Sequence, residues 1–388
     1  MRLRHPDGTT VHLAYCSNVH PAEDLAGIHE QLRRFVGPVR AELGVDRLGL
    51  GLWLPAQAAG RLAADPAAVA ALRALLEEQG LEVVTLNAFP YGGFHDPVVK
   101  HRVYRPDWTE RERLDYTLDA AQVLAGLLPE DAARGSISTL PLAWHTPWSP
   151  ERAAAARAHL AELATGLARL RDRTGRTVRV GFEPEPGCVV ETTTDAVREL
   201  SDIDTELLGV CVDTCHLATA FEEPAPAVAR LRDAGLPVVK SQVSAALHVA
   251  DPASAPARAL LADFVEDRFL HQVREPSQDG VLGRDDLPDA LDRDPLPGRE
   301  PWRIHFHLPL HSAPRDPLGS TAAELTESLR ELVGGEHPLT DHLEVETYTW
   351  TVLPADQRPA DDAGLVTGIA AELRYAREQL VSLGLEDA

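Results

Sequence analysis

The sequence predicts an α/β protein, a (β/α)8 barrel, and three observations support this prediction. Short apolar, β-branched runs alternate along the chain with Ala-, Leu-, Arg- and Glu-rich segments of helical period. The chain has 388 residues, whereas a barrel needs roughly 250, so the length fits one barrel with insertions. No G-x-G-x-x-G or Walker sequence follows an early strand, which disfavours the alternative of a doubly wound open sheet.

Nine runs are expected to be strands, one more than a barrel needs. They are residues 11–15, 47–54, 81–86, 135–140, 178–182, 208–212, 237–243, 302–308 and 343–348. One of the late runs is therefore assigned to an insertion, in which 269–273 would form a hairpin with 302–308.

Helices are expected between these strands, because the intervening segments carry apolar residues at helical spacing. They are residues 22–41, 67–79, 110–128, 150–173, 194–200, 225–234 and 321–333, followed by a last helix over 362–383. A Pro- and aromatic-rich segment, 91–108, is expected to be a first insertion. The second, 248–301, is expected to be a lid or an oligomer contact within a single barrel domain that spans 1–388.

Charge and composition exclude several classes of function. The chain has 37 Lys and Arg against 60 Asp and Glu, a net charge of −23, which disfavours nucleic acid and anionic membrane surfaces as partners. No apolar run approaches the roughly 20 residues that cross a bilayer, and no signal peptide is recognisable. The 4 cysteines form no C-x-x-C pair, so a reduced, cytoplasmic protein is expected.

Polar side chains gather directly after the predicted strands, where a barrel builds its active site. Those following the first four strands and the sixth are expected to bind substrate or assist catalysis. They are Asn18, His20, Trp53, Asn87, His95, His145 and His216. Trp53, Phe89, Tyr91 and Trp144 would offer flat surfaces to a sugar or cyclitol ring, although core packing explains each of them equally well.

Two acidic residues end apolar runs, and a carboxylate in such a place is costly unless it is paired or binds metal. Glu183 follows V-R-V-G-F, and Asp213 follows G-V-C-V. Both are therefore candidate metal ligands or catalysts rather than members of structural ion pairs. Glu185 shares the face of Glu183 one layer higher, which favours contact with substrate. His216 is as easily a helix cap as a catalyst.

The late part of the chain offers further candidates. His305 and His307 share one strand face, so one of them would bind metal if that strand lines the barrel, and both would lie at the surface or in a lid otherwise. Glu344 and Glu346 also share a face, and the deeper one is expected to be structural. Lys240 is either an amine with a lowered pKa or an ion-pair partner of the carboxylates, and the ion pair is favoured.

A site of two or three carboxylates with one His or amide suits a single divalent ion, with Mn, Mg, Co, Zn and Fe all acceptable. Such an ion binds neighbouring oxygens of a hydroxyketone or polyol, polarises the carbonyl and acidifies the adjacent C–H. Two carboxylates can then move the proton.

Glu183-Pro followed by Asp213-Thr-Cys-His216 resembles the xylose-isomerase-like superfamily of TIM barrels, which includes sugar epimerases, inosose dehydratases and the endonuclease IV fold. The resemblance implies a metal held by residues closing strands five to eight. Glu183, Asp213 and Glu346 match three of these places. If H-F-H is the seventh strand, the fourth ligand is His307 and Gln242 is expected to contact substrate. If K-S-Q-V-S is the seventh strand, the fourth ligand is Gln242, which binds metal more weakly than a histidine.

A closer resemblance covers nearly the whole chain. The segments L-A-Y-C-S-N-V-H-P, N-A-F-P-Y-G-G-F-H, V-Y-R-P-D-W, S-I-S-T-L-P-L, D-T-C-H-L-A, H-F-H-L-P-L and E-V-E-T-Y-T-W are similar to the EboE group of bacterial metabolite traffic proteins. This resemblance implies a small polyhydroxylated metabolite, derived from a sugar or cyclitol, as the partner, and is compatible with a homodimer.

These expectations lead to one main hypothesis and three alternatives. The main hypothesis is a metal-dependent isomerase or epimerase, with Glu183 and Glu346 as metal ligands and acid–base pair, and with His216 and Lys240 positioning or polarising the substrate. The first alternative is a dehydratase or lyase acting on a cyclitol. The second is a non-catalytic carrier with a degenerate metal site, which Gln242 favours. The third, DNA repair of the endonuclease IV type, is opposed by the net charge of −23.

Overall fold

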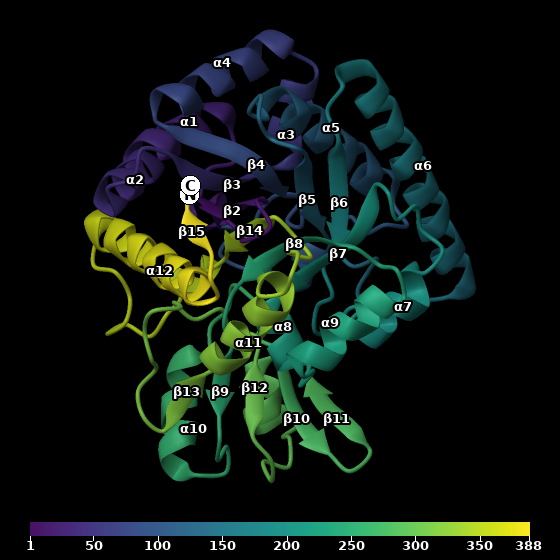
Figure 1. Cartoon of the computed structure of the whole chain (residues 1–388). Coiled ribbons are helices and arrows are strands. Elements are labelled where there is room, and N and C mark those ends of the chain that lie inside the picture. The colour runs from purple at the N-terminus through teal and green to yellow at the C-terminus, as the bar shows by residue number, and fades with distance from the viewer.

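Eight parallel strands form a closed barrel in the computed structural model, which describes residues 1–388 (Figure 1). Neighbouring strands follow chain order, and β14 pairs with β2 to close the ring. The barrel strands are β2 (Thr10–Cys16), β3 (Leu48–Trp53), β4 (Leu81–Asn87), β5 (Gly135–Thr139), β6 (Val178–Phe182), β7 (Leu208–Asp213), β8 (Val238–Val243) and β14 (His342–Val345). This arrangement confirms the predicted α/β barrel.

Helices surround the barrel and bury their apolar faces against it. They are α1 (Leu25–Gln31), α2 (Gly37–Leu43), α3 (Ala56–Ala63), α4 (Pro66–Glu78), α5 (Arg111–Leu127), α6 (Pro150–Thr174), α7 (Thr193–Leu200), α8 (Thr214–Thr219), α9 (Pro224–Asp233), α11 (Ala322–Val333) and α12 (Asp362–Ser382). In α6, Leu160, Leu163, Leu167 and Leu170 recur every three to four residues and form the buried stripe.

The first predicted helix, 22–41, is divided in the structure. Asp24 accepts a hydrogen bond from the Gly27 amide at 2.7 Å and thereby caps α1, so the helix begins three residues later than expected. A π-helical turn over Leu32–Val36 then separates α1 from α2. The sequence pattern shows the helical periodicity, but it does not show this change of pitch.

A second, antiparallel sheet projects from the barrel beside α9 and α11 (Figure 1). Its strands are β9 (Leu247–Val249), β10 (Val273–Ser277), β11 (Gly280–Arg284), β12 (Trp302–Ile304) and β13 (Leu318–Ser320), and α10 (Ala255–Leu261) lies within the same stretch. The sheet therefore extends beyond the predicted insertion of 248–301 on both sides. Val273 pairs with Ile304, so the run 302–308 is the extra one that lies in this sheet, and the seventh barrel strand is β8.

The two chain ends meet at the amino-terminal side of the barrel. β1 (Arg2–Arg4) pairs with β2 and with β15 (Glu386–Asp387), and Figure 1 shows both termini side by side. One continuous apolar core joins the barrel, its helices and the second sheet. All four cysteines are free and buried. None of the helices combines the length and the apolar character that a membrane-spanning segment needs.

Candidate metal centre and adjoining pocket

Three acidic side chains converge at the carboxyl-terminal end of the barrel. Glu183 follows β6, Asp213 ends β7 and Glu346 follows β14. All three are buried, and each places a carboxylate oxygen within 4.8 Å of the other two. Parallel strands deliver their last residues to the same end of a barrel, which explains how side chains so distant in sequence meet here.

Neighbouring amide side chains hold Glu346 in place. Asn18 and Asn87 donate to its Oε1 at 2.7 and 2.9 Å, and Gln242 donates to its Oε2 at 2.8 Å. The structure thus brings three residues that were expected to bind substrate, Asn18, Asn87 and Gln242, onto one carboxylate. Of the three, only Asn18 also lines the adjoining pocket.

Asp213 is held through one of its two oxygens. Its Oδ1 accepts from the His216 backbone amide at 2.9 Å and from the Ser244 hydroxyl at 2.7 Å. The first of these bonds makes Asp213 the N-cap of α8. Its Oδ2 has no hydrogen-bond partner and lies 3.8 Å from His216 Nε2 and 3.9 Å from His307 Nε2.

Four buried oxygens at this site have no hydrogen-bond donor: Asn18 Oδ1, Glu183 Oε2, Asp213 Oδ2 and Gln242 Oε1. Leaving such acceptors unpaired in the interior costs free energy, and a divalent cation among the carboxylates would satisfy those of Glu183 and Asp213. Carboxylate and amide oxygens are ligands that Mg²⁺ and Mn²⁺ prefer. These residues therefore fit a hard divalent ion.

Burial and the repulsion between neighbouring carboxylates raise the pKa of two glutamates at this site. Burial, followed by the nearby charges of Glu346 and Asp213, raises the pKa of Glu183 well above its usual value. Burial, followed by the charges of Asp213 and Glu344, raises the pKa of Glu346 to about 8. Without a cation these side chains therefore favour their protonated forms at neutral pH.

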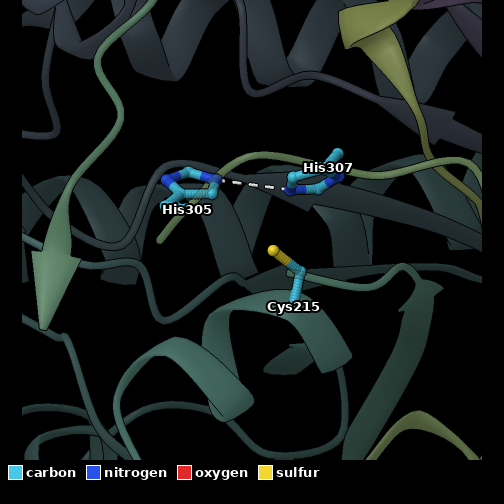
Figure 2. A group of neighbouring side chains, drawn as sticks. All are labelled: Cys215, His305 and His307. Atoms are coloured by element: carbon cyan, nitrogen blue, oxygen red, sulfur yellow. Dashed lines mark hydrogen bonds between the residues drawn. The ribbon is translucent and has the colours of Figure 1, made fainter. Parts of the chain in front are cut away.

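A group of histidines adjoins the carboxylates. His305 Nε2 lies 3.0 Å from His216 Nε2 and 3.3 Å from His307 Nε2. Figure 2 shows the rings of His305 and His307 facing each other above the thiol of Cys215. His307 Nε2 also lies 3.9 Å from Asp213 Oδ2, so the two groups share this aspartate.

The other ring nitrogen of each histidine is bonded to a carbonyl oxygen. His216 Nδ1 donates to Pro184 O at 2.9 Å, and His307 Nδ1 donates to Glu346 O at 2.7 Å. His305 Nδ1 donates to Gln272 Oε1 at 2.8 Å. The Nε2 lone pairs of all three rings therefore point at one another, an arrangement suited to a borderline ion such as Zn²⁺.

Burial keeps these imidazoles neutral. It lowers the pKa of His216 to about 4 and lowers the pKa of His307 below its usual value. For His305, burial and then the neighbouring His216 lower the pKa well below the usual value. Neutral imidazole is the form that binds a metal ion.

The structure shows where the two candidates for the fourth ligand, Gln242 and His307, lie. Gln242 occupies the seventh barrel strand, β8, whereas H-F-H follows β12 in the second sheet. If H-F-H lay in the insertion, His305 and His307 were expected at the surface or in a lid, and a surface position is wrong because they are 4% and 1% exposed. The insertion folds back and delivers both of them to the centre of the site.

Lys240 does not reach the pocket, so we correct its catalytic assignment. It is fully buried inside the barrel, where its ammonium forms an ion pair with Glu344, one layer below Glu346. Burial is the largest single influence and would lower the pKa of Lys240, but the Glu344 carboxylate and smaller influences of neighbouring groups together raise the pKa above its usual value. Lys240 and Glu344 are therefore structural partners.

Four further residues expected to bind substrate lie outside the pocket. His20 stacks on Phe35 with a centroid separation of 4.4 Å. Trp53 donates from its indole nitrogen to Pro90 O at 2.9 Å. His145 is exposed and contacts Gly187 O. His95 contacts the Asn18 backbone carbonyl at 2.7 Å and so supports a pocket residue from behind.

Glu185 does line the pocket, as expected for a substrate contact, and it belongs to a chain of polar groups. Tyr104 donates to Glu185 Oε1 at 2.7 Å, and Gln272 donates to the Tyr104 oxygen at 2.9 Å. The same Gln272 accepts from His305. Burial raises the pKa of Glu185 to about 8, although the Tyr104 hydrogen bond lowers it in part.

The pocket, of about 500 Å³ including its open mouth, lies directly above these groups. Sequence reasoning missed much of its wall, which comes from the 91–108 segment, from the insertion and from the turn after β14. The missed residues are Val99, Val103, Tyr104, Phe269, Leu270 and Tyr348. Tyr104 lies within V-Y-R-P-D-W, so that motif was a usable signal, whereas apolar residues in loops carry no chemical signature of their own.

Comparison with known proteins supports the fold. Residues 40–298 match the family model described as "Xylose isomerase-like TIM barrel". No curated protein matches the sequence. A D-allulose 3-epimerase from Methylomonas sp. has a TM-score of 0.51 at 13% identity, with 98% of this chain and 100% of that chain covered.

Two other solved structures are comparably similar. The D-psicose 3-epimerase of Clostridium cellulolyticum H10, solved with D-tagatose, has a TM-score of 0.52 at 12% identity, covering 95% of this chain and 99% of that chain. A xylose isomerase-like TIM-barrel protein from Mycobacterium smegmatis, in complex with magnesium, has a TM-score of 0.52 at 14% identity, covering 96% and 97%. At these identities the likeness concerns the fold alone.

Proposed function

This chain belongs to the xylose isomerase-like TIM-barrel family, and on that premise we propose that it is a metal-dependent isomerase or epimerase acting on a sugar or cyclitol. The observation that supports the proposal best is the convergence of the buried Glu183, Asp213 and Glu346 carboxylates within 4.8 Å of one another, with Glu183 Oε2 and Asp213 Oδ2 left without a donor. The solved neighbours named above include two epimerases of ketoses and one magnesium complex.

The divalent ion would be held by Glu183, Asp213 and Glu346, with the Gln242 carbonyl as the fourth protein ligand. When bound, such an ion polarises a substrate carbonyl and increases the acidity of the neighbouring C–H. His307 remains the alternative fourth ligand, because its Nε2 lies 3.9 Å from Asp213 Oδ2. Gln242 is preferred because it lies on the barrel strand next to Asp213.

Glu183 and Glu346 are the acid–base pair of this proposal. Both carboxylates are buried and have a raised pKa, that of Glu346 at about 8, so both bind a proton more readily than an exposed glutamate does. Asn18, Asn87 and Gln242 fix the orientation of Glu346 through its two oxygens. His216 and Glu185 line the pocket beside them and would contact substrate hydroxyls.

Three further proposals remain open. The similarity to the EboE group suggests a role in metabolite traffic. A dehydratase acting on a cyclitol would use the same carboxylates, since removal of a proton next to a carbonyl also begins elimination. A carrier without turnover would bind the same ligand through the same residues.

Elemental analysis of protein purified without chelator tests the metal proposal. We expect at least one equivalent of a divalent metal per chain, and one equivalent fewer in Glu183→Gln. The matched control is Glu112→Gln, which changes an exposed glutamate on α5 and should leave the metal content unchanged. Metal-free protein that takes up no Mn²⁺, Co²⁺ or Zn²⁺ would contradict the proposal.

Turnover in D₂O separates the reaction classes. An isomerase or epimerase transfers a proton without loss of atoms, so recovered ketose or cyclitol should contain one deuterium at the carbon that reacts. A dehydratase would yield a product lighter by one water, and a carrier would return its ligand unlabelled. Glu346→Gln should abolish the labelling if this carboxylate moves the proton.

A further inference from the structure

The pocket above the carboxylates has a polar floor and an apolar roof. Carboxylates, imidazoles and Asn18 form the floor. The roof consists of Phe94, Val99, Val103, Phe269 and Leu270. The two surfaces therefore present different chemistry to the two ends of a bound molecule.

Two segments that are distant in sequence build this roof and hold each other in place. The backbone amides of Val99 and Lys100 both donate to Arg268 O at 2.8 Å. The Phe94 and Phe269 rings pack with centroids 5.1 Å apart. These contacts join the 91–108 segment to the insertion, so the apolar surface is a built part of the pocket.

The pocket lacks a free cation. Lys100 is the one lysine or arginine in its wall, and all three of its ammonium protons have acceptors. They are Asp286 Oδ2 at 2.6 Å, Phe269 O at 2.7 Å and Glu266 O at 3.1 Å. A phosphate group would find no free ammonium or guanidinium here. Even with the proposed divalent cation bound, the three ionised carboxylates of the centre would leave the floor with a net negative charge, which repels a phosphate.

A molecule with hydroxyls on every side would also fit poorly, because hydroxyls against the roof would lose their hydrogen bonds to water and gain none. We infer that the substrate is an amphiphile: an unphosphorylated sugar or cyclitol that carries an alkyl, prenyl or aryl group. The hydroxylated end faces Glu183 and Glu346, and the apolar group lies against the roof. This inference rests on the proposed function for the polar end.

The exposure of the wall indicates where the apolar group would leave the pocket. Lys100, Val103 and Tyr348 are half-buried, whereas the other residues of the wall are buried. The mouth therefore lies beside these three side chains. A chain longer than the roof would extend past Val103 toward solvent.

Calorimetric titration of the full-length protein, saturated with Mn²⁺, tests this substrate class. The probes are myo-inositol, myo-inositol 1-phosphate and 1-O-hexyl-myo-inositol, with fructose, fructose 6-phosphate and a hexyl fructoside as the second series. We expect the hexyl compound of at least one series to bind more than tenfold tighter than its parent, since burying methylene groups is favourable. The corresponding phosphate should bind more weakly than the parent.

A pair of isosteric variants adds the control. Val103→Thr places a hydroxyl in the roof and should weaken binding of the hexyl compound several-fold, with no change for the parent polyol. Val98→Thr makes the same change at a position that is 50% exposed and outside the pocket, and should alter neither affinity.

The outcomes separate this inference from the proposed function. Equal affinity for parent and hexyl compound, or preference for the phosphate, overturns the amphiphile and leaves the isomerase proposal standing. Hexanol binding as tightly as the hexyl polyols supports the apolar roof and contradicts the proposed sugar or cyclitol end. No binding of any probe by protein that holds its metal overturns the substrate class, while the metal count still supports the centre.

Discussion

Gln242 donates a hydrogen bond to Glu346 Oε2 at 2.8 Å, while its own carbonyl oxygen has no partner although it is buried. The two residues lie on or directly after neighbouring strands, β8 and β14. The amide therefore orients a carboxylate with one atom and leaves the other atom for a cation. An amide oxygen is a weaker ligand for a transition metal than an imidazole nitrogen.

Replacing this amide by an imidazole should strengthen the metal centre. We expect Gln242→His to bind Co²⁺ or Zn²⁺ at least tenfold tighter than the unaltered protein, in competition with a chromophoric chelator. Gln242→Leu, which is similar in size but has no ligand atom, should bind more weakly than both. If the three proteins have the same affinity, Gln242 is not a ligand and His307 becomes the candidate.

The stability of the metal-free protein should fall as the pH rises from 6.5 to 8.5. Burial raises the pKa of Glu346 and of Glu185 to about 8. The folded protein therefore holds these two protons more tightly than the unfolded chain does. Their contribution to the free energy of unfolding is fully present below the unfolded pKa of about 4.5 and is lost as the pH rises through 8. Histidines with a lowered pKa act in the opposite direction, but only below their unfolded value of about 6.5. Burial lowers the pKa of the Met1 amine to about 5, so this one group makes the folded protein more stable as the pH rises. It opposes the two glutamates but does not outnumber them.

Thermal unfolding in chelator, followed across this pH range, measures the effect. Glu346→Gln should show a smaller decline in Tm, since its side chain has no proton to lose. Added Mn²⁺ should stabilise the protein more at pH 8.5 than at pH 6.5, because metal competes with protons for the same oxygens. A Tm that rises with pH in chelator would contradict the pKa shifts.

Breaking the buried pair of Lys240 and Glu344 should destabilise the barrel. Lys240→Met leaves the Glu344 carboxylate buried without a partner, which costs about 3–5 kcal/mol in other proteins. The Glu344 side chain fills the space beside Gly51, since a Cβ on residue 51 would lie only 1.4 Å from Glu344 Oε1. The carboxylate already packs against β3 and cannot move further in that direction. Urea denaturation of Lys240→Met and of the Lys240→Met, Glu344→Leu double variant provides the measurement, and the double variant should recover part of the loss.

The histidine group should hold a second metal equivalent when the protein is saturated with Co²⁺. His305→Ala should remove this equivalent and leave the carboxylate centre filled, because His305 contacts none of the three acidic ligands. Cys215→Ser reveals whether the thiol participates, since a cobalt–thiolate bond adds a charge-transfer band in the near ultraviolet. One equivalent in both the unaltered protein and His305→Ala would show that the histidines serve the substrate instead.

The sequence by itself determined the architecture and the carboxylates of the centre. Alternating strand and helix periods specify a parallel barrel, and such a barrel brings its strand ends together, so Glu183, Asp213 and the pair Glu344 and Glu346 could be placed at one site from their positions. The family resemblance then selected Glu346 as the third ligand. The same logic indicated that the deeper member of the Glu344 and Glu346 pair is structural, and the ion pair of Glu344 with Lys240 agrees with this.

Only the tertiary structure decided what surrounds those carboxylates. His305 and His307 come from a sheet outside the barrel, and the apolar roof comes from loops, so no strand period predicts where they lie. Their places depend on long-range contacts, such as the hydrogen bonds of Val99 and Lys100 to Arg268. Regular hydrogen bonding makes strands readable from local pattern, whereas the return path of an insertion depends on packing between segments far apart in the chain.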